Sequence, residues 1–527
     1  MAKLHEAQRR HAAHYLEVLN ETDYLYIAGG ESIESAVEIF KQAWENIRIG
    51  QAWSARHFGS DDAAAEYCLA YPGAGTYLLN LSQHPLDSIN WLEAALAAAR
   101  KAEDHEGETA YLTSLGVAFH YLGEIGKAIG YYEQSLVISR EIGDRENEGN
   151  NLGNLGSAYA DRGDFRLAIT FHEQRVEIAR EIRDRRGEGA ALTNLGNSWG
   201  VLGEVKRAIE YYEQALAIDR ELGDRKGEAD DLGNLGGAYL DLGEIGRAID
   251  YYEQHLSIAR EIGNRRGESN ALGNLGIAYV TLGQPRGAIT QYEQQLAIAR
   301  EINYQRGEAS ALGNIGNAWL DLGETKRAIK HYEQALVITD RLGDKQGKAI
   351  NYGNLGNAYN KLGQIQLAIE YHENALRIDR EIGEPKAEGA DLGNLGIDYE
   401  ALDQVDRAIE YFQQHLVIAR KVSDRLGEGL ALGNLGNIYR RIGNHQVALQ
   451  YLEQHLAIAR ELGDERSEGA DWGNLGLTYA AMGDINRAIE CIETGVKIFV
   501  KIEDPRVTQL RSRLALWQEQ NRKDVAC

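Results

Sequence analysis

Residues 153–156 read Gly-Asn-Leu-Gly, and the asparagine and final glycine of this stretch return every 40 residues along the chain. The same four residues stand at 233–236, 273–276, 353–356, 393–396, 433–436 and 473–476. The stretches at 193–196 and 313–316 differ at one position each, and the one at 113–116 has Ser114 in place of the asparagine. A fixed period of this size is typical of a solenoid, in which one small structural unit is stacked many times.

The composition of the chain fits such a stack. Its 527 residues exceed what one hydrophobic core usually supports, whereas a stacked repeat contacts only its neighbours and escapes that limit. The chain has only five prolines, and helix-forming residues are abundant. We therefore predict an all-α fold built of helix-turn-helix units.

The charge of the chain restricts its partners. A formal net charge of −24 argues against a nucleic acid, which needs a basic surface, and against an anionic membrane. No apolar run approaches the roughly 18–20 residues of a membrane span, and the N-terminus lacks the apolar stretch of a secretory signal. Cys68, Cys491 and Cys527 are too far apart in sequence to indicate a disulfide framework or a zinc site. We expect a cytoplasmic protein.

Each unit is expected to contain two helices. In residues 191–230, Leu192, Leu195 and Trp199 follow the spacing of one helical face. Gly203 then interrupts the pattern, and Gly223 stands where a left-handed helix cap is needed. Glycine inside a helix costs about 1 kcal/mol relative to alanine, so a glycine at one helical position of every unit predicts close approach of a neighbouring helix. These glycines are Gly116, Gly156, Gly196, Gly236, Gly276, Gly316, Gly356, Gly396, Gly436 and Gly476.

The unit resembles the tetratricopeptide repeat (TPR) family. Trp472, Leu475, Gly476, Tyr479 and Ala488 match the pattern W-x2-L-G-x2-Y…A of that family. The period is 40 rather than 34 residues, and arginines replace the proline that usually stands near the end of the second helix. This long variant is similar to repeats of kinesin light chain, partner-of-inscuteable adaptors and bacterial nephrocystin-like proteins. The resemblance implies a right-handed superhelical solenoid that binds protein and is not an enzyme.

We expect three parts in the chain: a helical N-terminal segment at 1–106, ten 40-residue units at 107–507, and a closing helix with a tail at 508–527. Residues 71–75, Tyr-Pro-Gly-Ala-Gly, are expected to form a turn, and 89–100 read like the second helix of a degenerate unit. Residues 9–16 and 44–53 are similar to the linker between the NB-ARC ATPase and the TPR sensor of bacterial STAND proteins. The phosphate-binding motif G-x-x-x-x-G-K-[ST] is absent, so an NB-ARC-type ATPase would be a partner module rather than part of this sequence.

The recurring asparagines are the main candidates for a binding site. In the TPR family the first helix of each unit lines the concave surface, and an asparagine before the Leu-Gly pair commonly hydrogen-bonds the main chain of an extended peptide. Helices pack about 8–10 Å apart and an extended chain advances ~3.3 Å per residue, so each asparagine would meet about every third peptide residue. The resemblance thus implies peptide binding by Asn154, Asn194, Asn234, Asn274, Asn314, Asn354, Asn394, Asn434 and Asn474.

Two alternatives stay open for these asparagines, which we call the ladder. Each amide would instead bridge adjacent first helices, or would be inherited from recent duplication without a role of its own. The Glu-Gln doublets, such as Glu213-Gln214, repeat almost as well and have no expected place in the groove.

Positions beyond the ladder vary and would give specificity. Three residues further on, four units carry a second asparagine, and one turn further the charge changes from acidic to basic along the chain. We therefore expect a ligand with a basic and an acidic end, and a carboxylate near Asn317, Asn357, Lys361 and Arg440–Arg441. The candidate residues are Asn197, Asn317, Asn357, Asn437, Asp161, Asp241, Asp321, Lys361 and Arg441.

No constellation of residues indicates catalysis, a metal or a cofactor. His255, His415 and His455 occupy one repeat position and so lie a repeat or more apart, whereas metal ligands must converge on one ion. The Arg-Glu doublets, such as Arg180-Glu181, are expected to form ion pairs between stacked helices. The sequence favours the ligand-sensing or adaptor part of a STAND-type signalling system. The alternative is a self-assembling scaffold, a homo-oligomer whose groove holds a neighbour's terminus.

Overall fold

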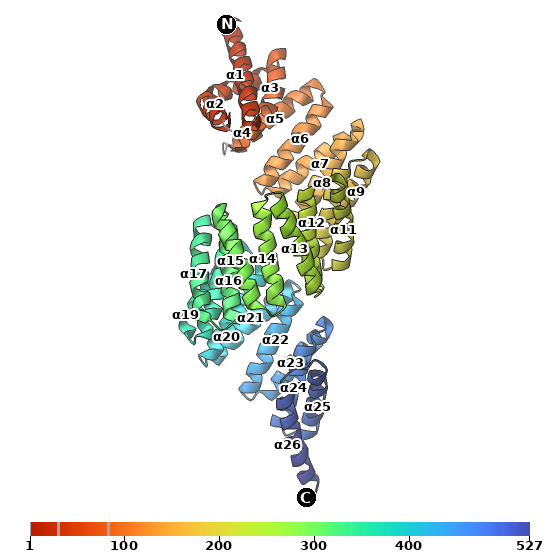
Figure 1. The fold of residues 1–527 in the computed structure, drawn as a ribbon, viewed down its shortest axis with the longest axis vertical. Helices are drawn as coiled ribbons and strands as arrows, with labels where there is room; N and C mark the ends of the chain where they lie inside the picture. The colour runs from red at the N-terminus through yellow and green to blue at the C-terminus, as the bar shows by residue number, and fades with distance from the viewer. Residues whose placement is uncertain (1, 29–31, 82–84, 527) are drawn as a thin grey trace. The chain divides into compact units, whose positions relative to one another are not determined.

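The computed structural model describes residues 2–28, 32–81 and 85–526, and within these ranges the chain forms 26 helices and no strand (Figure 1). Positions 1, 29–31, 82–84 and 527, which belong to the expected N-terminal segment and C-terminal tail, lie outside the described residues. None of the helices in the described ranges combines the length and the apolar character that crossing a bilayer requires.

Five helices precede the repeats. Leu19, Phe40, Tyr71 and Trp91 form a shared core among them. Helix α3 contacts α1, α2 and α5, so these helices pack as one body rather than as a strict hairpin series. The five are α1 (Ala2–Ala28), α2 (Ser32–His57), α3 (Asp62–Ala74), α4 (Thr76–Leu81) and α5 (Pro85–Ala102).

The predicted turn at residues 71–75 is wrong for most of its length. Helix α3 continues to Ala74 with Pro72 inside it, and Gly75 separates it from α4. Tyr71 is fully buried and its hydroxyl donates to the carbonyl of Ala12 at 2.8 Å. This burial holds the last turn of α3 helical, although proline removes one backbone donor there.

The repeats form ten helix pairs, each with a first and a second helix. In chain order the pairs are α6 (His105–Tyr121) and α7 (Ile125–Ile142), α8 (Arg145–Asp161) and α9 (Phe165–Ile182), α10 (Arg185–Val201) and α11 (Val205–Leu222), α12 (Arg225–Asp241) and α13 (Ile245–Glu261), α14 (Arg265–Thr281) and α15 (Pro285–Glu301), α16 (Gln305–Asp321) and α17 (Thr325–Leu342), α18 (Lys345–Lys361) and α19 (Ile365–Ile382), α20 (Pro385–Ala401) and α21 (Val405–Lys421), α22 (Arg425–Arg441) and α23 (His445–Leu462), and α24 (Glu465–Ala481) and α25 (Ile485–Lys501). A last helix, α26 (Val507–Ala526), packs on α25.

The turns between pairs follow the predicted capping pattern. Gly223 has a φ of +68°, the left-handed conformation that glycine adopts at least cost. The carboxylate of Asp224 then accepts a hydrogen bond from the backbone N–H of Gly227 at 3.0 Å, which caps α12. These two residues end one helix pair and begin the next within a short turn.

The chain divides into two compact units, residues 1–267 and 268–527. Within each unit, second helices pack on the first helix of the following pair. Contacts between first helices also recur: α6 with α8, α8 with α10 and α10 with α12 in one unit, and α16 with α18, α18 with α20 and α20 with α22 in the other. The first helices α6, α8, α10 and α12 of one unit, and α16, α18, α20 and α22 of the other, therefore lie next to one another in series within their unit.

Candidate functional site

The recurring glycine fixes how each first helix packs on its partner. A Cβ added to Gly316 would lie 2.4 Å from the ring of Tyr332, and one added to Gly356 would lie 2.4 Å from the ring of His372. Similar clashes occur in the other pairs, with Leu452 against Gly436 and an isoleucine in the last pair. The predicted close approach is confirmed, and the group that fills the space is a side chain of the second helix.

The ladder asparagines stand two residues before these glycines, and all nine are half-buried. Each is followed by a buried leucine or isoleucine, so the amide lies at the edge of the packed face. No side-chain hydrogen bond joins any of the nine to another residue of the described ranges, although many neighbouring polar groups do pair. Among the described residues, no hydrogen bond supports the alternative in which these amides bridge adjacent first helices.

The second asparagine position is exposed and behaves differently from pair to pair. The hydroxyl of Tyr212 donates to Asn197 at 2.8 Å, and that of Tyr332 donates to Asn317 at 2.7 Å. Asn357 and Asn437 make no such bond, since their pairs carry His372 and Leu452 where the tyrosine would stand. Two of these four candidates thus already use their carbonyl oxygen, a pairing visible in the sequence as a tyrosine 15 residues later.

The last turn of the first helices forms a rim of cross-links between consecutive pairs. The Nε2 atom of His120 lies 2.6 Å from the Oδ2 atom of Asp161, and the ammonium of Lys361 donates to the carbonyl of Leu320 at 3.0 Å. The guanidinium of Arg441 lies 3.6 Å from Glu400 and 3.6 Å from Asp403. The predicted basic residues of the rim therefore already have acceptors on the preceding pair. Asp241 and Asp321 are exposed at the equivalent position.

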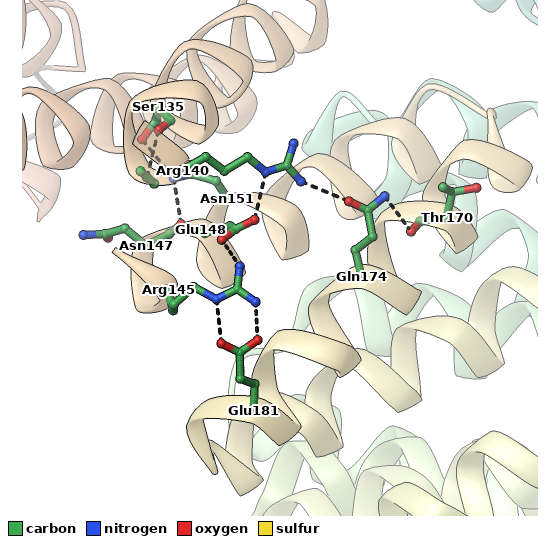
Figure 2. Close-up of polar contacts among 10 residues, drawn as sticks. Ser135, Arg140, Arg145, Asn147, Glu148, Asn151, Thr170, Gln174 and Glu181 are labelled. Carbon is green, nitrogen blue, oxygen red and sulfur yellow. Dashed lines mark hydrogen bonds and ion pairs between the residues drawn. The ribbon is translucent and has the colours of Figure 1, made fainter. Parts of the chain in front are cut away.

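The opposite ends of the helices carry a polar network that the sequence indicates only in part (Figure 2). Arg140 donates to Glu148 at 2.8 Å, and Arg145 bonds both Glu148 and Glu181. These bonds, with Arg180 and Glu188 at 2.7 Å in the following pair, confirm the predicted ion pairs. Arg140 also donates to Gln174 at 3.1 Å.

This bond from arginine to glutamine links successive second helices. It recurs between Arg420 and Gln454 at 2.9 Å. The repetition of the Glu-Gln doublets thus has a structural origin outside the surface formed by the first helices.

The histidine position is part of the packing between helices. His255 and His415 are buried, and burial lowers the pKa of both rings, so they are neutral near pH 7. His455 lies 2.8 Å from Asp471. Within the described residues no group of three or more histidine, cysteine, aspartate or glutamate side chains is arranged to hold a metal ion.

A family model described as tetratricopeptide repeat matches residues 120–181, 147–221, 187–261, 232–301, 307–381 and 389–461, and a second model with the same description matches residues 472–499. These matches cover more than half of the chain. The chain belongs to the tetratricopeptide repeat family. Its helix pairs are TPR units, and nine of the ten first helices, α8 to α24, carry a ladder asparagine. No curated protein matches the chain.

Several solved TPR-like structures are similar to this chain in part. The apo quorum sensor NprR from B. thuringiensis is 17% identical with a TM-score of 0.49, and the match covers 71% of this chain and 99% of that one. A STAND protein with a tetratricopeptide repeat sensor from Pyrococcus horikoshii is 14% identical with a TM-score of 0.48, covering 79% and 65%. BtubC from P. vanneervenii is 22% identical with a TM-score of 0.39, covering 41% and 91%.

Proposed function

We propose that this TPR solenoid is a non-enzymatic binding protein that holds an extended protein segment along its first helices, mainly through the asparagine ladder. The observation that carries the proposal is the state of the nine amides. They recur in nine of the ten TPR units, are half-buried, and have no side-chain hydrogen bond to another residue of the described ranges. Half-buried amides of this kind can bond water or a ligand, and their recurrence at one position of the first helices favours a ligand that runs along those helices.

An asparagine amide suits the main chain of a peptide. It offers two donors and one acceptor, so one side chain can pair with a peptide C=O and N–H together. Neighbouring first helices are about 8–10 Å apart, which corresponds to about three residues of an extended chain. The compact unit of residues 1–267 contains Asn154, Asn194 and Asn234. The compact unit of residues 268–527 contains the other six ladder asparagines, which are Asn274, Asn314, Asn354, Asn394, Asn434 and Asn474.

Specificity would come from the positions around the ladder. Asn357 and Asn437 have unoccupied amides, whereas Ile277 and Ile397 present exposed apolar side chains at the same position. Lys361 donates to the backbone carbonyl of Leu320, and the guanidinium of Arg441 lies 3.6 Å from Asp403. A ligand carboxylate would replace these acceptors. Asp241 and Asp321 are exposed on the same rim of their own units and would attract basic groups.

The biological setting we propose is the sensor or adaptor part of a STAND-type signalling system in the cytoplasm. The support is the resemblance of residues 9–16 and 44–53 to the linker that follows an NB-ARC ATPase. An ATPase module on another chain, or on an adjoining part of a longer protein, would then respond to ligand binding by the repeats.

Affinity capture from cell extract tests the ladder. We expect a variant with Asn354, Asn394 and Asn434 changed to alanine to lose at least tenfold of the captured partner. A matched control changes Gln294, Gln334 and Gln413, three exposed amides on second helices of the same unit, to alanine. It should capture as much as the wild type.

Equal capture by both variants, with helical content unchanged, would show that the ladder is not the binding surface. Solution mass separates the self-assembling alternative, because that alternative requires an oligomer at micromolar concentration.

A further inference from the structure

Two junctions between consecutive TPR units each contain a pair of aspartates, and of these four residues three are buried and Asp219 is half-buried. Asp219 of α11 faces Asp231 of α12, and four repeats later Asp379 of α19 faces Asp391 of α20. Asp231 is 1% exposed, Asp379 5% and Asp391 6%. Other junctions carry buried alanines at both positions, such as Ala299 with Ala311 and Ala419 with Ala431. The fold therefore does not need carboxyl groups there.

The hydrogen bonds of these aspartates fit carboxyl groups that hold a proton. Asp231 accepts from the hydroxyl of Thr193 at 2.8 Å through one oxygen, and its other oxygen is buried without a partner. Asp379 and Asp391 are close enough for their carboxyl groups to share a hydrogen bond, which forms only when one of them is protonated. The remaining oxygen of Asp391 is also buried without a partner.

The groups around the first pair are mostly acidic. Asp224, Asp230 and Glu228 disfavour the ionised form of this pair, and Arg186 of α10 opposes them at Asp219. Glu228 is itself bonded by Arg220 at 2.8 Å. Tyr212 of α11 lies nearby as a neutral phenol, because burial raises its pKa to about 12. His255 of α13 packs against Gly233 of α12 and is neutral near pH 7.

The second pair has a similar environment. Glu384 in the turn and Glu388 of α20 act on Asp379, and Glu388 is bonded by Arg380 at 2.7 Å. His415 of α21 packs against Gly389 and Gly393 of α20 as a neutral ring. From α18, Gly353 approaches Asp391 without a charge.

We propose that the α11–α12 and α19–α20 junctions are proton-sensitive joints, closed when each aspartate pair holds a proton and loosened when it is lost. Asp231 and Asp391 lie one helical turn before Asn234 and Asn394, so loosening a joint displaces one asparagine of the ladder. The inference stands on the buried pairs and does not depend on peptide binding.

The sign of the pH dependence follows from the pKa shifts. Burial, followed by neighbouring acids, raises the pKa of Asp231 to about 7 and that of Asp219 to about 6, and burial and Asp379 raise the pKa of Asp391. In the opened junction each would titrate near the ordinary value of about 4. Between these limits opening releases a proton, so the closed α11–α12 joint loses stability as pH rises from about 4 to about 7, and at α19–α20 the loss continues to about pH 8.

Hydrogen exchange of the full chain tests the joints. Protection factors, corrected for intrinsic exchange, should fall about tenfold per pH unit between pH 5 and 7 in α11–α12 and α19–α20. A variant with Asp231→Asn and Asp391→Asn should lack this fall, because asparagine cannot ionise. A matched control, Asp250→Asn with Glu370→Gln, removes two exposed charges from α13 and α19 and should keep it.

A second variant guards against misfolding of the first. Asp379→Ala with Asp391→Ala reproduces the alanine pair of other junctions and should make α19–α20 independent of pH, while α11–α12 still responds. If wild type and both variants show the same pH profile in these helices, the joints do not exist.

Discussion

At the scale of single residues, the recurring glycine makes the sharpest prediction. Gly316→Ala would place a methyl group 2.4 Å from the ring of Tyr332, which is fully buried and has no room to move. We expect a loss of about 1–3 kcal/mol from overpacking, which outweighs the gain in helix propensity. Urea denaturation of the full chain measures this as a lower midpoint.

The matched control is the same substitution at a helical glycine without close neighbours. Gly130 is inside α7, and no atom comes within 4 Å of a Cβ added there. Gly130→Ala should therefore stabilise the chain by about 0.5–1 kcal/mol. Equal effects of the two substitutions would contradict the close packing at the glycine position.

The sequence predicts the packing of such a residue only where the pattern within one helix determines it. The close approach at the glycines follows from a helix position that accepts the cost of glycine in every unit. The bond from Tyr212 to Asn197 depends on a second helix and on a side-chain rotamer, so periodicity does not reveal it. The pairing of Asp379 with Asp391 was missed for the same reason, because each residue alone reads as an ordinary polar position in a variable column.

At the scale of helices, one junction reverses the recurring ion pair. Arginine on the second helix normally bonds glutamate on the next first helix, as Arg300 bonds Glu308 at 2.7 Å. At the α17–α18 junction Asp340 occupies the arginine position and bonds Lys348 in the glutamate position. Both charges are exchanged together, so the attraction between the helices is kept.

This reversal gives a charge-swap test. Lys348→Glu faces Asp340 with a like charge and should lower stability by about 0.5–1 kcal/mol, as expected for a partly exposed pair. Adding Asp340→Arg should restore it. Thermal unfolding at low and high salt measures both, since screening should reduce the difference. A single variant as stable as the wild type at low salt would show that the pair contributes nothing.

Helix boundaries also show where local patterns stop being sufficient. Proline and two glycines at 72–75 predict a turn, yet burial of Tyr71 keeps α3 helical to Ala74. In the repeats, most turns between pairs have a left-handed glycine and most have a capping aspartate, so local signals and packing agree, and the alternation of helices was predictable. The difference is that helices α1–α5 pack as an irregular body whose contacts no repeat pattern encodes.

At the scale of the whole molecule, each unit presents first helices that contact their successors, and every first helix after α6 carries one ladder amide. The solenoid follows from the 40-residue period, and the resemblance to the TPR family follows from the W-x2-L-G-x2-Y…A pattern within it. The identity of the ligand does not follow from the sequence, because the ladder would bind backbone groups that all peptides share. Only the variable positions around it carry information about a particular partner.

The most direct test of the ladder uses the bound segment itself, once capture has delimited it to a short peptide. Methylating one backbone nitrogen at a time removes one main-chain donor without changing any side chain. The ladder predicts that calorimetric affinity falls at least tenfold at positions about three residues apart, and little between them. Affinity that ignores backbone methylation and follows only side-chain substitution would contradict binding of the main chain by the ladder asparagines.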